Sequence, residues 1–420
     1  MSTTGWPKRY TVVGMCFLAA FICYIDRVNI SVAAIAMQEE FGWSETTKGF
    51  VLSSFFIGYI LTQAVAGWLA NRFGCKLVLG FAVTWWSVFT ILTPFAAAGS
   101  FGLLIAARIA LGLGEAATFP GTYGMLGKWV PPQERSRSMA ILMSGIPVGT
   151  LFALMTTGWI VTEYGWPAAF YSFGVVGLFW AAAWYTFIYE TPDQHPTISS
   201  AERELIGQRE SGAGEKPPVP WGLLARTPAF WALIVNHFCS NWVLYIFLAW
   251  LPSYFRDVQG LTITGAGIYS AAPWASMFLM TNVGAWIADT LIKRGMSITN
   301  VRKLMQSIGL LGTGFFLLLV RDVDSSTTAV IYMSAALGLA SFTIPGFGTN
   351  HLDIAPRYAD VLVGITNTFG TIPGIVGVAL TGWLIDQTGS YDSIFVVVAV
   401  TNVIGTAIWL TFASGEKLID

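Results

Sequence analysis

The sequence predicts an all-α polytopic membrane protein with twelve transmembrane helices in two six-helix bundles. Two features of the composition predict the membrane: 55% of the 420 residues are hydrophobic and only 11% are charged, against about 25% charge in soluble domains. The third observation is a series of apolar segments that each reach or exceed about 20 residues, the length that crosses a bilayer. The 18 Trp residues agree with this, because Trp gathers at membrane interfaces.

The composition also excludes other classes of protein. A cytosolic enzyme or a disordered chain would carry more charge, and a net charge of −1 provides no field that attracts nucleic acid. The four Cys residues do not form the spacing pattern of a disulfide framework. We therefore expect the lipid bilayer as a partner, no nucleic acid, and no metal or organic cofactor.

The first six spans follow one another within residues 1–189. The first span is too long for the apolar core of a signal peptide and contains Asp26 and Arg27, so we expect it to remain as a transmembrane helix. Charged or Gly/Pro-rich breaks separate the segments. They lie at 10–37, 46–71, 77–98, 100–129, 137–162 and 166–189.

A hydrophilic segment, residues 190–227, divides the chain near its middle. Ser199-Ser200-Ala201-Glu202 has the form of a capping box and predicts a short surface helix there. Six more apolar segments lie at 228–256, 262–292, 301–320, 327–352, 358–387 and 391–413. The predicted domains are an N-terminal six-helix bundle at 1–189, a cytoplasmic central loop at 190–227 and a C-terminal six-helix bundle at 228–420.

The orientation of the chain follows from its basic residues. Most of the 22 Lys and Arg residues fall on one side of the predicted spans, whereas Lys48, Arg256 and Arg321 fall on the other. The positive-inside rule places both termini and the central loop in the cytoplasm, as an even number of spans requires.

The two halves of the chain repeat each other. The segment that begins Thr157-Gly158-Trp159 is similar to the segment that begins Thr381-Gly382-Trp383, at corresponding places in the two halves. A parallel duplication of a six-helix unit puts a substrate site near the midplane between the halves.

Four charged residues lie inside apolar spans, and they are the strongest functional signal in the chain. They are Asp26 and Arg27 in the first span and Arg108 and Glu115 in the fourth. Each costs about 2.5–3.5 kcal/mol at the centre of a membrane helix unless it is paired or lines a wet cavity. Arg108 and Glu115 are two helical turns apart and share a face.

Two interpretations of these charges stay open. In the first, they form an ion-pair network that only locks the first helix to the fourth. In the second, which we favour, they form a proton-coupled anion site. An Arg fork binds a carboxylate with two hydrogen bonds, and a carboxyl group is cheaper to bury as the neutral acid.

Other polar residues in the spans are weaker signals. Side chains that could hydrogen-bond a hydroxylated substrate, or instead join neighbouring helices, are Tyr24, Tyr59, Asn241, Ser341, Thr343 and Asn367. We interpret His237 and His351 as structural, because no metal-binding spacing accompanies them. Pro345-Gly346 predicts an irregular helix, while Gly112, Gly145 and Gly149 suit close helix contacts.

A tight basic turn follows the second span. Its residues satisfy the orientation rule, and they can also form a clasp that stabilises one conformation of the halves. The clasp residues are Gly67, Asn71, Arg72 and Lys76, with Asp289 at the corresponding place in the second half.

These motifs resemble the major facilitator superfamily and, within it, the anion:cation symporter family that includes the eukaryotic solute carrier 17 group. The turn from Gly67 to Lys76 is similar to the superfamily's loop signature, with Asn71 in place of an Asp. Further family-like motifs are Tyr24-Ile25-Asp26-Arg27-Val28-Asn29, Ser54-Phe55-Phe56-x-Gly58-Tyr59, Arg108-x6-Glu115 and Asn350-His351-Leu352-Asp353-Ile354-Ala355-Pro356-Arg357.

The resemblance implies a major facilitator fold and the import of an organic anion, a sugar acid or another carboxylate, together with protons. It implies Asp26 and Glu115 as the protonation sites. It also implies Arg27 as a contact of the substrate carboxylate, Arg108 as a partner of Glu115 or of the anion, and Tyr24, Tyr59 and Asn367 as pocket residues.

Alternatives within and outside transport remain. Sodium-coupled uptake of phosphate or another anion is the second transport hypothesis, so the coupling ion is H⁺ or Na⁺. An intramembrane enzyme is disfavoured because the spans contain no metal or nucleophile constellation, and a membrane sensor because no sizeable soluble domain is present. We expect a monomer in a bacterial inner membrane with both termini in the cytoplasm.

Overall fold

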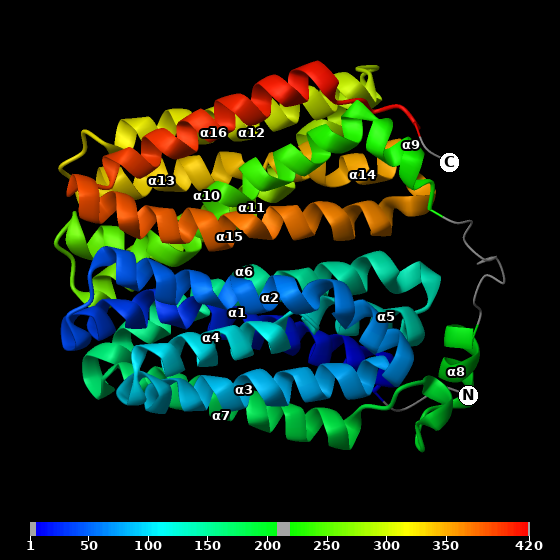
Figure 1. The fold of residues 1–420 in the computed structure, drawn as a ribbon. Helices are drawn as coiled ribbons and strands as arrows, with labels where there is room; N and C mark the ends of the chain where they lie inside the picture. The colour runs from blue at the N-terminus through cyan, green and yellow to red at the C-terminus, as the bar shows by residue number, and fades with distance from the viewer. Residues whose placement is uncertain (1–5, 208–218, 419–420) are drawn as a thin grey trace. The chain divides into compact units, whose positions relative to one another are not determined.

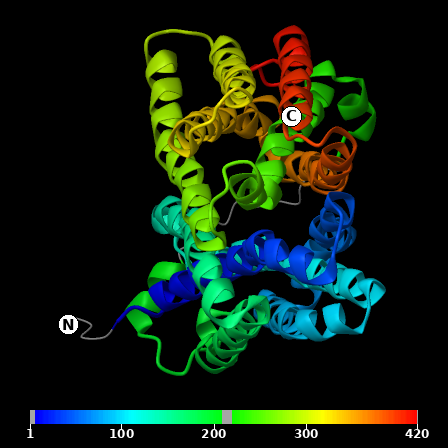
Figure 2. The same ribbon diagram turned by 90° about the vertical axis from the view of Figure 1, so that its left-hand side faces the viewer.

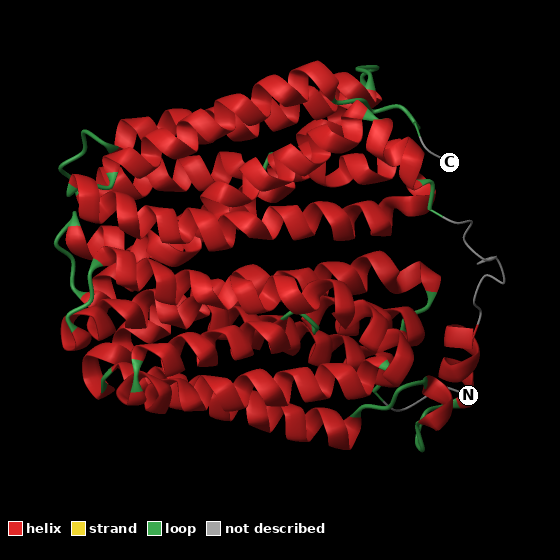
Figure 3. Cartoon of the chain, viewed as in Figure 1, coloured by secondary structure: helices red, strands yellow, loops and turns green. Residues whose placement is uncertain are grey.

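A computed structural model describes residues 6–207 and 219–418 of the chain. Within these residues the regular elements are all helices, and no strand occurs (Figure 3). The segment 208–218, part of the predicted central loop, lies outside the described residues. The fold class predicted from the sequence is therefore confirmed.

The helices follow the predicted spans in order along the chain (Figure 1). Those of the first half are α1 (Lys8–Phe41), α2 (Glu45–Phe73), α3 (Cys75–Gly99), α4 (Phe101–Glu115), α5 (Thr118–Trp129), α6 (Arg135–Tyr164) and α7 (Trp166–Phe187). Two short helices, α8 (Ser200–Gly207) and α9 (Trp221–Arg226), flank the segment that is not described. Those of the second half are α10 (Pro228–Asp257), α11 (Ile263–Lys293), α12 (Ile298–Val320), α13 (Ser326–Ala340), α14 (Thr349–Ile354), α15 (Ala359–Thr388) and α16 (Asp392–Phe412).

Two predicted spans are interrupted helices. The span at 100–129 is broken after Glu115 into α4 and α5, and the span at 327–352 consists of α13, a π-helical turn at Ile344–Gly348 and α14. By length and composition, eleven spans in the described part of the chain can cross a membrane. Helix α2 is bent by 51° between Glu45–Gln63 and Val65–Phe73, and it brings the number to twelve if these two segments count as one span.

The Cα positions group into two compact units. The first contains residues 1–33 and 54–214, and the second contains residues 34–53 and 215–420. Figure 2, turned by 90° from Figure 1, shows each unit as a bundle of helices. The end of α1, the turn after it and the start of α2 thus group with the second half of the chain, which the sequence did not indicate.

In the first unit, glycines allow helix backbones to touch. A Cβ atom on Gly112 of α4 would lie 2.1 Å from the backbone oxygen of Phe55 on α2, and one on Gly58 would lie 1.9 Å from a backbone oxygen of α4. Cβ atoms on Gly145 and Gly149 of α6 would lie 2.7 and 2.5 Å from backbone oxygens of α1. The predicted close helix contacts are therefore confirmed.

The start of α1 is capped by a residue far away in sequence. Glu202 of α8 accepts hydrogen bonds from the backbone N–H groups of Lys8 (3.1 Å) and Arg9 (3.0 Å). The backbone N–H of Glu202 donates to Ser199 Oγ at 3.2 Å, which is the Ser half of the predicted capping box, while the Glu202 carboxylate is bound to the start of α1. A carboxylate at a helix N-terminus satisfies free N–H groups and interacts favourably with the helix dipole, so α8 is anchored on α1.

In the second unit, residue Asp386 of α15 caps α2. Its two carboxylate oxygens accept from the backbone N–H groups of Glu45 (3.0 Å) and Thr46 (2.7 Å). A Cβ atom on Gly382, one turn earlier, would lie only 2.2 Å from the backbone oxygen of Glu45. The start of α2 is therefore held against α15 by a cap and by a close backbone contact.

Lys48 adds a buried charge to the same region. Its side chain is 0% exposed, and Nζ lies 2.7 Å from Glu45, 2.7 Å from Gln38 Oε1 and 3.8 Å from Asp257. The ammonium also lies 4.9 Å from the centre of the Trp250 ring, within the range of a cation–π contact. Lys48 thus joins the start of α2 to α10.

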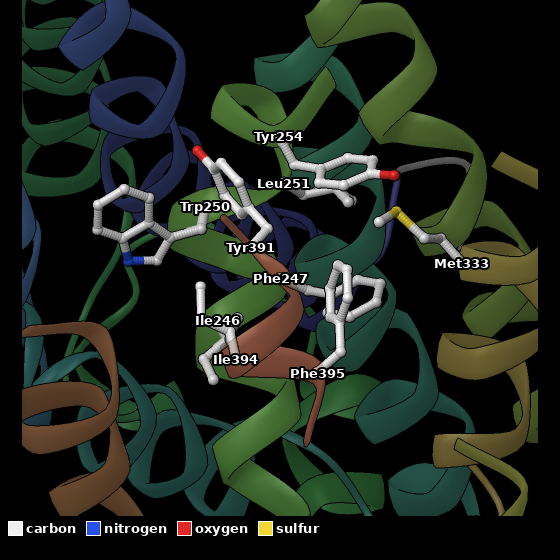
Figure 4. A pocket seen from close by; sticks show the side chains of 9 residues that line it. All are labelled: Ile246, Phe247, Trp250, Leu251, Tyr254, Met333, Tyr391, Ile394 and Phe395. Carbon is white, nitrogen blue, oxygen red and sulfur yellow. The ribbon is translucent and has the colours of Figure 1, made fainter. Parts of the chain in front are cut away.

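A small apolar cavity of about 20 Å³ lies beside these residues in the second unit (Figure 4). Trp250 and Tyr391 line it, with the Tyr391 hydroxyl donating to Asp257 at 2.9 Å. A space of this size has room for about one water molecule and cannot hold an organic anion. We interpret it as a packing gap.

The π-helical turn at Ile344–Gly348 confirms the irregularity predicted at Pro345-Gly346. Gln306 Oε1 accepts from the backbone N–H of Phe347 at 3.2 Å, and Arg302 donates to the backbone oxygen of Pro345 at 3.0 Å. Side chains of α12 therefore satisfy backbone groups that the irregular turn leaves unpaired.

His237, which is half-buried, and His351, which is buried, are both hydrogen-bonded, as the structural interpretation predicts. The Thr366 hydroxyl lies 3.1 Å from His237 Nδ1 and 2.8 Å from His351 Nε2. His351 Nδ1 lies 3.0 Å from the backbone oxygen of Gly348.

Candidate functional site

The four charged residues predicted within the spans lie together in the first unit. Asp26 and Arg27 are on α1, and Arg108 and Glu115 are on α4. Their exposed fractions are 1%, 7%, 1% and 0%. A charged side chain that is removed from water to this extent must form an ion pair, become neutral or take part in function.

Arg27 and Glu115 form the ion pair of this cluster. Arg27 Nη2 and Nε donate to Glu115 Oε2 at 3.0 and 3.2 Å. Glu115 is the last residue of α4, directly before the break at Ala116 and Ala117. The guanidinium that contacts Glu115 is therefore that of Arg27, whereas the resemblance named Arg108 for this pairing or for the anion.

Aromatic rings surround the Arg27 guanidinium. Its Cζ lies 4.8 Å from the ring centre of Tyr24, 5.0 Å from Phe55 and 4.8 Å from Tyr59. Tyr24 precedes Arg27 by three residues, and Phe55 and Tyr59 are four residues apart, so each set shares a helix face. The close glycine contact of α2 with α4 fixes the two α2 rings here.

Asp26 is buried and forms no ion pair with any residue that the structure describes. Neither carboxylate oxygen has a hydrogen-bond partner among the described residues. The charged and polar groups that act on this carboxyl group include Trp86 and Thr90 of α3 and Glu115 and Arg108 of α4. An ionised carboxylate is costly in such a place, whereas the neutral acid is not.

Arg108 is the second cation of the cluster. Its Nε and Nη1 atoms have no hydrogen-bond partner in the described part of the chain, and its Cζ lies 5.6 Å from the Phe55 ring centre. A buried guanidinium with unused donors can bind the carboxylate or phosphate of a ligand. The cluster therefore combines a group that can hold a proton with a group that can hold an anion.

The remaining predicted substrate-binding residues divide between the units. Tyr24 and Tyr59 lie in the first unit beside Arg27. Asn241, Ser341 and Asn367 lie in the second. There, Asn241 donates to the backbone oxygen of Gly370 at 2.8 Å, the buried Ser341 donates to a backbone oxygen of its own helix, and Asn367 is half-buried.

The predicted clasp residues lie at helix ends. Asn71, Arg72 and Asp289 are exposed, and Gly67 has open space where a side chain would stand. Lys76 Nζ donates to a backbone oxygen of α7 at 3.3 Å. Gly67, Asn71, Arg72 and Lys76 belong to the first unit and Asp289 to the second, and the clasp stays a prediction.

A different residue, Glu190, secures this turn within the first unit. Its carboxylate accepts from the backbone N–H groups of Cys75 (3.0 Å) and Lys76 (2.7 Å) at the start of α3, and it pairs with Lys128 of α5. Gly74, which precedes them, has a φ of 95°, a conformation that favours glycine. Sequence reasoning missed Glu190 because it is more than a hundred residues from the turn.

Sequence reasoning also missed several residues of the charged cluster. Cys23 contacts Glu115, Phe55 contacts both arginines, and Trp86 and Thr90 face Asp26. Among these residues, only Cys23 could have been inferred from local sequence, because it lies one helical turn before Arg27 and shares its helix face. Within the described residues, no group of three or more His, Cys, Asp or Glu side chains could hold a metal ion.

Comparison with known families gives a match over most of the chain. Residues 16–377 match the family model described as Major Facilitator Superfamily. One similar protein is an Ascorbate transporter, chloroplastic, of Arabidopsis thaliana. It is 44% identical over 418 residues, which cover 99% of this chain and 76% of that protein. Another is a Sodium-dependent phosphate transport protein 1, chloroplastic, of the same plant, which is 44% identical over 99% of this chain and 81% of that protein. Sialin of Ovis aries is 34% identical and covers 97% and 90%.

Solved structures share the fold. A bacterial homolog of the human lysosomal transporter Spinster superposes with a TM-score of 0.81 at 18% identity, covering 97% of both chains. A D-xylose-proton symporter superposes with a TM-score of 0.78 at 15% identity, covering 97% of this chain and 99% of that one.

Proposed function

Because the chain belongs to the major facilitator superfamily and, within it, to the anion:cation symporter family, we propose that it carries an organic anion across the membrane together with protons. It is a multi-pass membrane protein and a transporter of a small anion, not an enzyme. The proposal concerns the finer points: the kind of anion, the coupling ion, the alternating-access cycle and the residues that perform it.

The observation that carries the proposal is the composition of the buried cluster. Two carboxyl groups and two guanidinium groups lie within it, yet Arg27–Glu115 is its only hydrogen-bonded ion pair among the described residues. Among the residues that the structure describes, the Asp26 oxygens and the Arg108 Nε and Nη1 atoms have no hydrogen-bond partner. A lock made only of ion pairs would use all four charges. The incomplete pairing favours a site that takes up a proton and an anion.

In the proposed cycle, Asp26 and Glu115 are protonated while the site faces the outside. Neutralisation of Glu115 releases Arg27, and Arg27 and Arg108 bind the carboxylate of the substrate. Tyr24, Tyr59, Asn241, Ser341 and Asn367 remain as proposed substrate-binding residues. Loss of the protons on the inner side restores the ion pair and favours release of the anion.

The test is uptake by purified protein in liposomes under an imposed pH gradient, with ascorbate, sugar acids and aromatic acids as substrates. We expect Asp26→Asn and Glu115→Gln to lose accumulation against a gradient but retain exchange. Glu163→Gln, an exposed carboxylate on α6, is the matched control and should behave like the wild type. Accumulation that persists in both cluster variants would refute the assignment.

Sodium-coupled transport of phosphate is the second candidate. The observation that favours it is the 44% identity to a relative named as a sodium-dependent phosphate transport protein. Replacing sodium by choline at fixed pH separates the two, because only sodium-coupled uptake stops. Phosphate uptake that stops in choline and ignores the pH gradient would establish this candidate.

The proposal includes a monomer whose two termini lie on the side rich in Lys and Arg. The sequence also led us to expect a bacterial inner membrane. The relatives named as chloroplastic give that location no support. We therefore propose only on which side of the membrane the termini lie, and not in which organelle or type of cell. Labelling of single cysteines introduced at the two ends of the chain, from each side of sealed vesicles, tests it.

A further inference from the structure

One oxygen of the Glu115 carboxylate receives all of its hydrogen bonds. Oε2 accepts from Arg27 Nη2 at 3.0 Å, from Arg27 Nε at 3.2 Å and from the Cys23 thiol at 3.3 Å. Oε1 is equally buried and has no partner among the described residues. A carboxylate offers roughly four lone-pair sites over its two oxygens, so the donors are gathered on one side of the group.

Cys23 is placed to act on this oxygen together with Arg27. It lies four residues before Arg27, so the two share a face of α1. Its side chain is 0% exposed, and Arg27 Nη2 lies 3.8 Å from Sγ. The thiol therefore lies against both members of the ion pair.

We infer that Glu115 takes up its proton on Oε1, and that Cys23 is a positioning residue that holds Oε2 before and after protonation. The inference rests on the proposed function, in which Glu115 carries a coupled proton. When a proton from water bonds to Oε1, the carboxylate becomes a neutral acid and loses its charge attraction for Arg27. Oε2 keeps lone pairs in the acid, so it still accepts the S–H hydrogen bond.

The two donors thus have different roles. Arg27 binds Glu115 mainly through the charge of the carboxylate. When Glu115 is protonated the ion pair is lost, and the N–H groups of Arg27 become available to the anion. Cys23 holds Glu115 without charge and keeps the side chain in place for the return of Arg27. Alanine at this position would leave Glu115 free to rotate in the protonated state.

Other groups that face Glu115 also affect its protonation, and an experiment must distinguish their effect from that of Cys23. They are Asp26 and Arg27 on α1 and Arg108 on its own helix, with Thr118 of α5 beside the thiol. Asp26 is the other carboxyl group of the cluster. The Asp26→Asn background removes it and leaves Glu115 as the carboxyl group that titrates there.

The first experiment is infrared spectroscopy of the full chain in lipid. The C=O stretching band of protonated Glu115 is identified by its loss in Glu115→Gln and followed against pH in the Asp26→Asn background. We expect Cys23→Ala to shift this band and to move its midpoint upward by about half to one pH unit, the effect of losing one weak donor to the carboxylate. Cys23→Ser, which keeps a donor, should restore the midpoint.

Cys16→Ala is the matched control. Cys16 is equally buried and lies two turns earlier on α1. In the part of the chain that the structure describes, the titratable group that acts on it is Cys75, which is not part of the cluster. The substitution should leave both the band and the midpoint unchanged. A band and midpoint that are identical in Cys23→Ala and the wild type, or that Cys16→Ala moves as far, would overturn the inference.

A second measurement needs no substitution of Cys23. The S–H stretching band of a hydrogen-bonded thiol depends on its acceptor, so Glu115→Gln should shift the Cys23 band and leave the Cys16 band in place. An unshifted Cys23 band contradicts the inference. If uptake by the wild type ignores the pH gradient while both infrared shifts are present, the proposed function fails and the role of Cys23 stands.

Discussion

Gly112→Ala should damage the charged cluster without touching any of its residues. The added Cβ would lie 2.1 Å from the backbone oxygen of Phe55 and must reach at least 3.0 Å, so α2 has to retreat from α4 by about 0.9 Å. Phe55 and Tyr59 move with α2, and their rings, now 5.0 and 4.8 Å from Arg27, approach the limit of about 6 Å for a cation–π contact.

The expected magnitude follows from these distances. Overpacking of this kind costs about 1–3 kcal/mol in the free energy of unfolding, and weakening two cation–π contacts costs about 0.5–1 kcal/mol each. Because about 1.4 kcal/mol corresponds to a factor of ten, uptake at low substrate concentration should fall by about tenfold. The measurements are thermal unfolding in detergent and initial uptake into liposomes.

Gly14→Ala is the control for the intrinsic effect of alanine in a helix. Gly14 lies on α1 with nothing within 4 Å of its added Cβ, so the substitution should leave uptake unchanged and unfolding unchanged or slightly improved. If Gly112→Ala unfolds and transports like Gly14→Ala, the close packing of α2 on α4 does not position the aromatic rings around Arg27.

Three further predictions concern helix ends and pH. Asp386→Asn removes the charged cap from the start of α2 and should lower the free energy of unfolding by about 1 kcal/mol, measured by denaturant titration; no change would mean that water replaces the cap. Glu190→Gln should destabilise the start of α3 by a similar amount, seen as faster amide exchange there and not at α2. Burial and the Lys8 ammonium lower the pKa of His195 below its usual value, so its neutral form favours the fold, and this contribution is lost as pH falls below about 6.5. His195→Gln should therefore show a smaller loss of thermal stability than the wild type between about pH 7 and pH 5; an equal loss in both refutes this.

Features that depend on local sequence could be predicted. The apolar segments predicted the spans because a bilayer sets their length. Gly145 and Gly149 predicted a close helix contact, because a backbone can approach only where no side chain stands, but not that the partner is α1. The irregular turn at Pro345-Gly346 followed from the missing N–H of proline.

Features that depend on distant parts of the chain could not be predicted. The spacing of Arg108 and Glu115 indicates a shared helix face, but it does not say which arginine reaches the carboxylate. That choice depends on how α1 is rotated against α4. The caps by Glu190 and Asp386 are also invisible in the sequence, since a carboxylate can satisfy any exposed helix start that folding brings near it.

The grouping of residues 34–53 with the second unit has a consequence for dividing the chain. A cut in the central segment, between α8 and α9, looks natural from the sequence, but the C-terminal fragment it produces lacks twenty residues of its own compact unit. Trp250 and Asp257 would lose Lys48, and Asp386 would have no helix start to cap. We expect that fragment to be unstable alone and to recover when the N-terminal fragment is co-expressed, or when a peptide spanning 34–53 is supplied.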